Sequence, residues 1–137
     1  MKDCVFCKIL RNESPAHKIW ENENFFAFLT LGSLNPGHTL LIPKSHVDYI
    51  FDLPEPLYSA IFQTAKLLSE PLLNAMKARR VGVIIEGFTV PHVHLHLVPL
   101  HDEDEIDPRR MTKMQANELA EIAATIKREI DFSTLLL

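Results

Sequence analysis

The sequence predicts an α+β domain in which a mostly antiparallel sheet packs against two principal helices. Two long segments place apolar residues at intervals of three and four, which is the spacing of one helix face. Several short apolar stretches are separated by turn-forming residues, as expected of strands. The length of 137 residues suits one domain with a hydrophobic core, so we expect residues 1–137 to form a single domain.

The N-terminal half is predicted to contain three strands. The chain breaks at Ser14-Pro15 and turns again at Asn35-Pro36-Gly37, and Pro43 ends the third strand. The predicted strands cover about Lys18–Trp20, then Phe25–Leu29 and His38–Ile42.

Two helices are predicted in the C-terminal half. The first covers about Pro54 to Ala78, and Pro71 is expected to kink or divide it, because proline cannot donate a backbone hydrogen bond. The second begins at a possible capping box, Thr112-Lys113-Met114-Gln115. The apolar faces consist of Leu57, Ile61, Ala65 and Leu68 in the first helix and Leu119, Ile122, Ala123 and Ile126 in the second.

Two further strands are predicted between these helices. Val81–Glu86 is rich in β-branched residues, which predicts a buried strand. The second strand covers His92–Val98, and Pro91 stands at its start, where a missing donor costs little.

Composition and charge exclude several classes of function. The formal net charge is −4 and the basic residues are scattered, so we expect neither nucleic acid nor a membrane as a partner. No apolar run approaches the ~20 residues that cross a bilayer, and the N-terminus does not resemble a signal peptide, so we expect a cytoplasmic protein. The acidic stretch 102–107 is interpreted as a solvated loop rather than a metal site, because nothing fixes its geometry.

The strand at 92–98 carries a histidine at every second position, so its three imidazoles share one face. Adjacent members lie ~6.6 Å apart and the outer two ~13 Å apart. Since zinc needs nitrogen ligands at ~2.1 Å, two neighbours can chelate one ion but three cannot.

A row of imidazoles suits a phosphate chain, where one attacks phosphorus while its neighbours donate hydrogen bonds. The alternative is an accidental polar face. The histidines are His92, His94 and His96, and Val93, Leu95 and Leu97 are expected in the core.

These motifs resemble the histidine triad (HIT) superfamily of nucleotidyl hydrolases and transferases. The apolar pair Leu97-Val98 completes the superfamily's signature after the three alternating histidines. The resemblance covers nearly the whole chain, and it implies a HIT-like fold and a homodimer. The other matching segments are Cys4–Leu10, Phe26–Leu29 and Asn35–His46.

The resemblance also implies a role for each histidine of the site. His94, in the middle of the triad, matches the nucleophile, which forms a covalent nucleotidyl intermediate at the α-phosphate before water hydrolyses it. This chemistry needs a neutral imidazole, oriented by the backbone carbonyl of His92. His96 matches a phosphate contact and proton donor to the leaving group, and His38 matches a fourth active-site histidine.

Substrate-binding residues follow from the same resemblance. Thr89, three residues before the triad, stands where relatives place a hydroxyl on the phosphate. Relatives usually carry Asp or Asn, a ribose ligand, at the position of Thr30, whose single hydroxyl is not a two-point acceptor. Many have Gln where this chain has Phe88. The candidates for an apolar base pocket, each of which also fits plain core, are Phe6, Ile9, Phe26 and Leu40.

The pair Cys4-x-x-Cys7 alone fits zinc, redox chemistry or two small core residues, and a structural disulfide is not expected in the cytoplasm. Some members of the superfamily use such a pair with two histidines to hold a structural zinc, and the matching histidines are His46 and His92. A closed tetrahedral site would fix the N-terminal segment to the sheet without taking part in the reaction. We therefore expect a structural zinc and no catalytic cofactor.

The leading hypothesis is a hydrolase that cleaves small nucleotides at the α-phosphate, such as dinucleoside polyphosphates or nucleoside phosphoramidates. A transferase or phosphorylase, in which another acceptor replaces water, is the second. The third is a nucleotide-binding regulatory module with slow chemistry, which Thr30 and Phe88 favour and the full histidine set disfavours. A zinc hydrolase needs an open metal position, which the expected ligand set does not provide.

Overall fold

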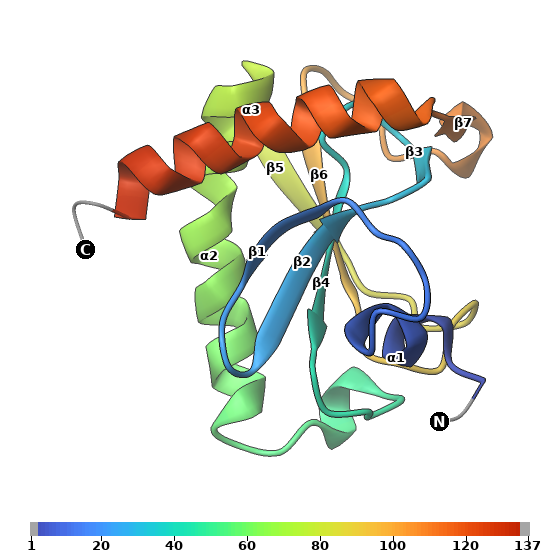
Figure 1. Cartoon of the computed structure of the whole chain (residues 1–137). Helices are drawn as coiled ribbons and strands as arrows, with labels where there is room; N and C mark the ends of the chain where they lie inside the picture. Colours follow the sequence, from blue (N-terminus) through green and yellow to red (C-terminus); the bar gives the residue numbers. More distant parts are fainter. Residues whose placement is uncertain (1–2, 135–137) are drawn as a thin grey trace.

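The computed structural model describes residues 3–134, and its main feature is a five-stranded antiparallel sheet with long helices packed against it (Figure 1). The strand order is β1-β2-β4-β6-β5, and β3 and β7 form a separate two-stranded sheet. The predicted α+β class is confirmed. The strands are β1 Lys18–Glu21, β2 Phe25–Leu29, β3 Gly32–Ser33, β4 Thr39–Pro43, β5 Arg80–Ile84, β6 Leu95–Leu100 and β7 Thr112–Lys113. The helices are α1 Val5–Leu10, α2 Leu57–Met76 and α3 Ala116–Thr134, with 3-10 turns at Ile50–Asp52 and Pro108–Arg110.

Alternation along the strands divides the sheet into two faces. Ala27, Leu41 and Leu95 point into the larger core, which includes buried side chains of α2 and α3. Phe28 and Leu40 point the other way, into a smaller cluster that includes α1. Figure 1 shows α1 beside β4, away from α3. The second face therefore has an apolar cluster under a short helix, and the triad residue of β6 also faces this way.

The two predicted strands of the C-terminal half differ from the structure. Val81–Glu86 was expected to be buried, but β5 is an edge strand and Val83 is 50% exposed. β-Branched composition does not distinguish an edge strand from a central one. The triad strand begins at Leu95 rather than His92, because the amides of residues 92 and 93 bond to the carbonyls of Val90 and Val47 instead of a neighbouring strand.

The helices also depart from the predictions in their ends and continuity. Pro71 does not divide α2, which continues through it with Leu68 and Leu72 fully buried on its inner face. The prediction that the last helix begins at Thr112 is wrong, because Thr112–Lys113 pair with Gly32–Ser33 as β7. The short helix α1 was not predicted. Among residues 3–134, no helix has the length and apolar character that a membrane span requires.

Candidate active site

The histidines lie on the face of the sheet that α1 partly covers. His96 is opposite Leu40 on β4, and Leu40 is opposite Phe28 on β2, so these three side chains form a row across the sheet. His94 is buried beside the row, and its ring centroid lies 5.1 Å from those of Phe6 and His96. In this site, therefore, the imidazoles lie next to apolar and aromatic side chains.

The ring of His94 is oriented by one backbone group. Its Nδ1 lies 2.7 Å from the carbonyl oxygen of His92. A carbonyl oxygen can only accept, so Nδ1 carries the proton and donates it. In the neutral ring, Nε2 then keeps its lone pair. This is the tautomer that a nitrogen nucleophile requires.

His38 and His96 form a directed hydrogen-bond chain. The amide of Leu34 donates to His38 Nδ1 at 3.1 Å, so the proton of neutral His38 is on Nε2. His38 Nε2 lies 2.9 Å from His96 Nδ1 and therefore donates to it. The remaining proton of neutral His96 is consequently on its Nε2, which makes that nitrogen a donor.

Both imidazoles of this chain are held neutral. Burial, then the charge of His96, lowers the pKa of His38 to about 4. Burial, then the charge of His94, lowers the pKa of His96 to about 4 as well. At neutral pH the pair therefore acts through hydrogen bonds, not through a fixed positive charge.

The low pKa of His38 predicts that the free energy of unfolding decreases as the pH is lowered from 6.5 to 4. In this window the unfolded chain binds the proton and the folded chain does not, so unfolding is favoured as pH falls. The variant His38→Gln keeps an N–H donor but does not titrate. Its free energy of unfolding should therefore decrease less than that of the wild type over this pH range, by up to about 3 kcal/mol. Denaturant unfolding at pH 7 and pH 4.5 measures the difference. Equal pH dependence in both proteins would contradict the assignment of a neutral, buried His38.

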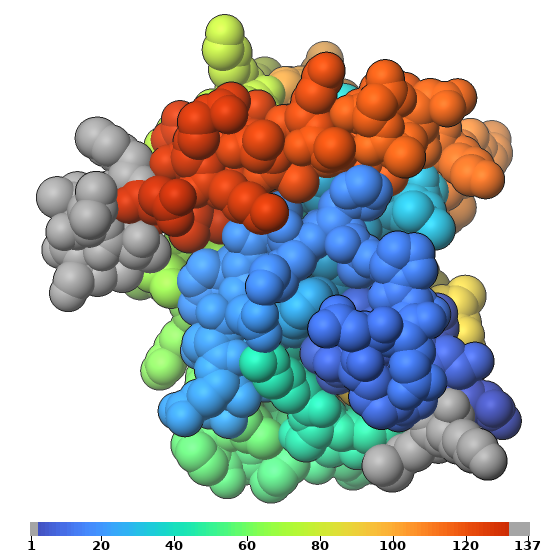
Figure 2. Space-filling view, viewed as in Figure 1, coloured from blue at the N-terminus to red at the C-terminus, as the bar shows by residue number. Residues whose placement is uncertain are grey.

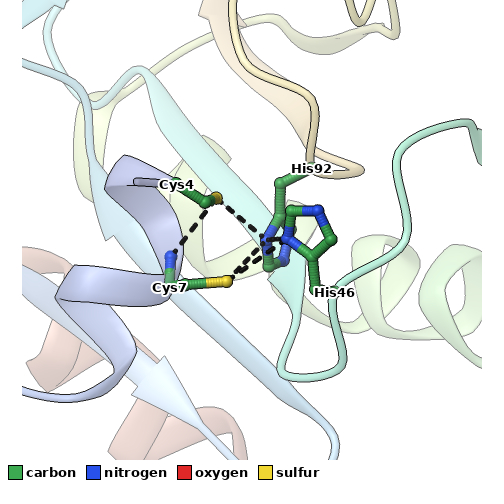
Figure 3. Close-up of side chains that lie close together, drawn as sticks. All are labelled: Cys4, Cys7, His46 and His92. Carbon is green, nitrogen blue, oxygen red and sulfur yellow. Dashed lines mark hydrogen bonds between the residues drawn. The ribbon is translucent and has the colours of Figure 1, made fainter. Parts of the chain in front are cut away.

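A second cluster contains residues from the start of α1, from the loop after β4 and from the segment before β6. Figure 3 shows the thiols of Cys4 and Cys7 pointing toward the imidazoles of His46 and His92. One ligand atom from each residue lies within 4.8 Å of all the others, and no other such group of three or more is present among the described residues. Sulfur-to-nitrogen distances are 3.3 Å from Cys7 to His46 and 3.5 Å from Cys4 to His92.

The chemistry of this cluster fits a metal ion. A tetrahedral zinc with bonds of ~2.0–2.3 Å holds its ligand atoms roughly 3.3–3.8 Å apart, close to the distances found here. His92 Nε2 donates to the carbonyl oxygen of Pro43 at 2.8 Å, so its Nδ1 presents a lone pair to the two sulfurs. Burial, the largest cause, lowers the pKa of His92 and keeps it neutral. The four residues can therefore hold a metal ion.

The four candidates for the base pocket separate into two pairs. Phe6 packs edge-to-face on Phe28, at 5.7 Å between ring centroids, and contacts His94 as well. Leu40 lies in the same row as His96. Ile9 and Phe26, in contrast, line a separate cavity that contains none of the histidines. Phe28 was missed by sequence reasoning, although alternation along Phe25–Leu29 places it on the same face as Phe26.

The two threonines with expected substrate contacts differ in exposure. Thr89 is exposed in the loop before the triad, where Phe88 is 90% exposed. Thr30 is buried, and its hydroxyl lies 3.1 Å from that of Ser33 and 3.4 Å from the carbonyl oxygen of His38. The Thr30 hydroxyl is thus already engaged inside the protein.

Comparison with known proteins agrees with the fold and the histidine pattern. Residues 11–103 match the HIT domain model, so this chain belongs to the HIT family. It is 36% identical over 105 residues to adenosine 5′-monophosphoramidase HNT1 of Saccharomyces cerevisiae, covering 73% of this chain and 64% of that protein. It is 27% identical over 137 residues to adenylylsulfatase HINT3 of Arabidopsis thaliana, covering 93% and 70%.

A solved structure extends this similarity to the whole fold. The crystal structure of a zinc-bound histidine triad family protein from Mycobacterium smegmatis superposes with a TM-score of 0.86 at 25% identity, over 99% of each chain. The expected HIT-like fold is confirmed.

Proposed function

We propose that this protein is a nucleotide hydrolase that cleaves at the α-phosphate with His94 as the nucleophile. The observation that supports this most directly is the 2.7 Å hydrogen bond from His94 Nδ1 to the His92 carbonyl, which leaves Nε2 free to attack. Two relatives are named for hydrolysis of small adenylyl compounds, a phosphoramidase and an adenylylsulfatase. A small nucleotide is therefore the proposed substrate.

The proposed reaction has two displacements at phosphorus. In the first, His94 Nε2 bonds to the α-phosphorus as the bond to the leaving group breaks, and the leaving group takes the electron pair and a proton. In the second, water attacks the phosphorus and loses a proton, which replaces the proton that the leaving group took up. The N–P bond breaks, and the imidazole regains its lone pair. The products are a nucleoside monophosphate and the protonated leaving group.

His96 and His38 are assigned supporting roles. His96 Nε2–H would donate a hydrogen bond to a phosphate oxygen or to the leaving group. His38 would hold His96 in the tautomer that has this donor, through the 2.9 Å bond between them. Thr89, Phe6, Leu40 and Phe28 are proposed as substrate contacts around these histidines.

We also propose that the metal cluster holds a structural zinc. Cys4, Cys7, His46 and His92 would complete a tetrahedron and leave no position for substrate. Such a zinc would attach α1, and with it Phe6, to the residue whose carbonyl orients His94. The homodimer and the cytoplasmic location implied earlier remain predictions.

A panel of substrates tests the proposed activity. Adenosine 5′-phosphoramidate, adenosine 5′-phosphosulfate and diadenosine polyphosphates should be offered to the wild-type protein, and at least one should yield AMP. Addition of inorganic phosphate distinguishes the alternatives, since a phosphorylase would produce ADP from the adenylyl group. Tight nucleotide binding without turnover of any compound would support the regulatory module instead.

Thr30 offers a test of sugar recognition. Thr30→Asp supplies a two-point acceptor, and if this position faces the ribose, binding of a ribonucleotide should tighten by ~1–3 kcal/mol. Its 2′,3′-dideoxy counterpart should gain much less. Isothermal titration of both ligands measures the difference, with Thr30→Asn as the uncharged control. Equal changes for both ligands would mean that this position does not contact the sugar.

A further inference from the structure

A cavity of about 860 Å³ lies beside the histidine site but is lined by none of its histidines. Its walls come from the end of α1, the connection to β1, the hairpin β1–β2 and the residue after β4. Figure 2 looks onto this side of the molecule, where the N-terminal segment (dark blue) stands beside the β1–β2 hairpin (lighter blue). The volume is within the ~300–1,000 Å³ usual for small-molecule sites.

The apolar part of the cavity is held firmly in place. Ile9, Leu10 and Phe26 contribute it, and Ile9 belongs to the smaller core cluster on this face. The half-buried ring of Phe26 packs on Phe28, at 5.8 Å between centroids. An aromatic side chain supported from behind in this way can stack against a planar ligand.

The polar rim carries two lysines, and both of them pair with the same carboxylate. Glu21 accepts from Lys18 Nζ at 2.7 Å and from Lys44 Nζ at 2.8 Å. These hydrogen bonds lower the pKa of Glu21 to about 2, so the carboxylate stays ionised and two ammonium groups share it. Glu13, the other acid in the lining, pairs with Arg11. Both lysines thus keep donors for a second anionic partner.

We propose that this cavity binds a small aromatic anion at a site separate from the histidines. Its ring would lie against Phe26 and Ile9, and its carboxylate or phosphate would lie between Lys18 and Lys44 through charge-assisted hydrogen bonds. The site does not depend on the hydrolase activity. A purely structural role of the ion pairs, fixing β1 to the end of β4, is the alternative that the test must exclude.

Backbone amide shifts of ¹⁵N-labelled protein measure binding at this cavity directly. The probes are 2-naphthoate, 2-naphthyl phosphate and the neutral 2-naphthalenemethanol. Both anions should shift the amides of Ile9, Leu10 and Phe26 saturably, about tenfold more tightly than the neutral compound. The ratio of the dissociation constants of the two anions shows whether the site prefers a carboxylate or a phosphate. Absence of saturable shifts at millimolar probe, or shifts confined to residues around His94 and His96, would overturn the proposal.

Two charge variants should change the affinity for 2-naphthoate in opposite directions. Lys44→Gln should weaken 2-naphthoate binding about tenfold, while Glu21→Gln should strengthen it severalfold, because both lysines are then free for the ligand. Lys66→Gln, an exposed site on α2, is the matched control and should have no effect. If the ion pairs are only structural, Lys44→Gln and Glu21→Gln lower the melting temperature alike and binding is absent. Weaker binding in Glu21→Gln would also contradict the proposal.

Discussion

Replacing His94 with alanine is expected to lower turnover by more than about 10⁴-fold while nucleotide affinity changes little. General acid or base assistance alone supplies ~10²–10⁴-fold, so a larger loss indicates a covalent role. Removing a bond that forms only during the reaction lowers kcat rather than raising KM. Steady-state kinetics together with equilibrium binding of AMP separate the two effects.

Two other histidine variants serve as comparisons for the loss of turnover in His94→Ala. His96→Ala should fall within the smaller range, because His96 is proposed to donate a hydrogen bond rather than to form a bond to phosphorus. His101→Ala changes an exposed histidine outside the site and should have wild-type activity. A wild-type rate in His94→Ala with every active substrate would refute the nucleophile assignment.

Loss of zinc is expected to have the second large effect. The purified protein should contain about one zinc per chain, and Cys4→Ser should lose it and melt about 10 °C or more below the wild type. The physical reason is that α1 is only six residues long, and its attachment to the sheet would depend on the metal. Metal analysis by mass spectrometry and calorimetric melting measure both quantities.

The zinc prediction has its own controls. Cys7→Ser and His46→Ala should resemble Cys4→Ser, since each removes one ligand of the same cluster. His101→Ala should keep both zinc and melting temperature. A stoichiometry near zero in protein prepared without chelators would contradict the prediction. Activity that survives removal of the zinc from a still folded protein would support a structural role for the metal.

Much of the site could be predicted because it depends on local alternation and on segments that match a known family. Strand periodicity placed Val93, Leu95 and Leu97 in the core, and all three are buried. The matching segments also brought Cys7 and His46 together, 39 positions apart in the chain and in contact in the structure.

The remaining features depend on contacts between distant segments that composition does not reveal. Thr112–Lys113 was predicted as a helix start, because its pairing with the distant residues Gly32–Ser33 cannot be read from the local pattern. The amide of Leu34 determines the tautomer of His38, but every residue except proline has a backbone amide, so the sequence does not indicate which one donates. The cavity beside Phe26 arises only where α1, β1 and the end of β4 meet.

Detection of the covalent intermediate tests the central claim most directly. Wild-type protein mixed with its best substrate from the panel, quenched within milliseconds and weighed intact, should show a fraction of chains heavier by one nucleotidyl group. Peptide mapping under conditions that preserve the N–P bond should place this group on His94, and His94→Ala should show none. Rapid turnover with no adduct at any quench time, or an adduct on another residue, would contradict nucleophilic attack by His94.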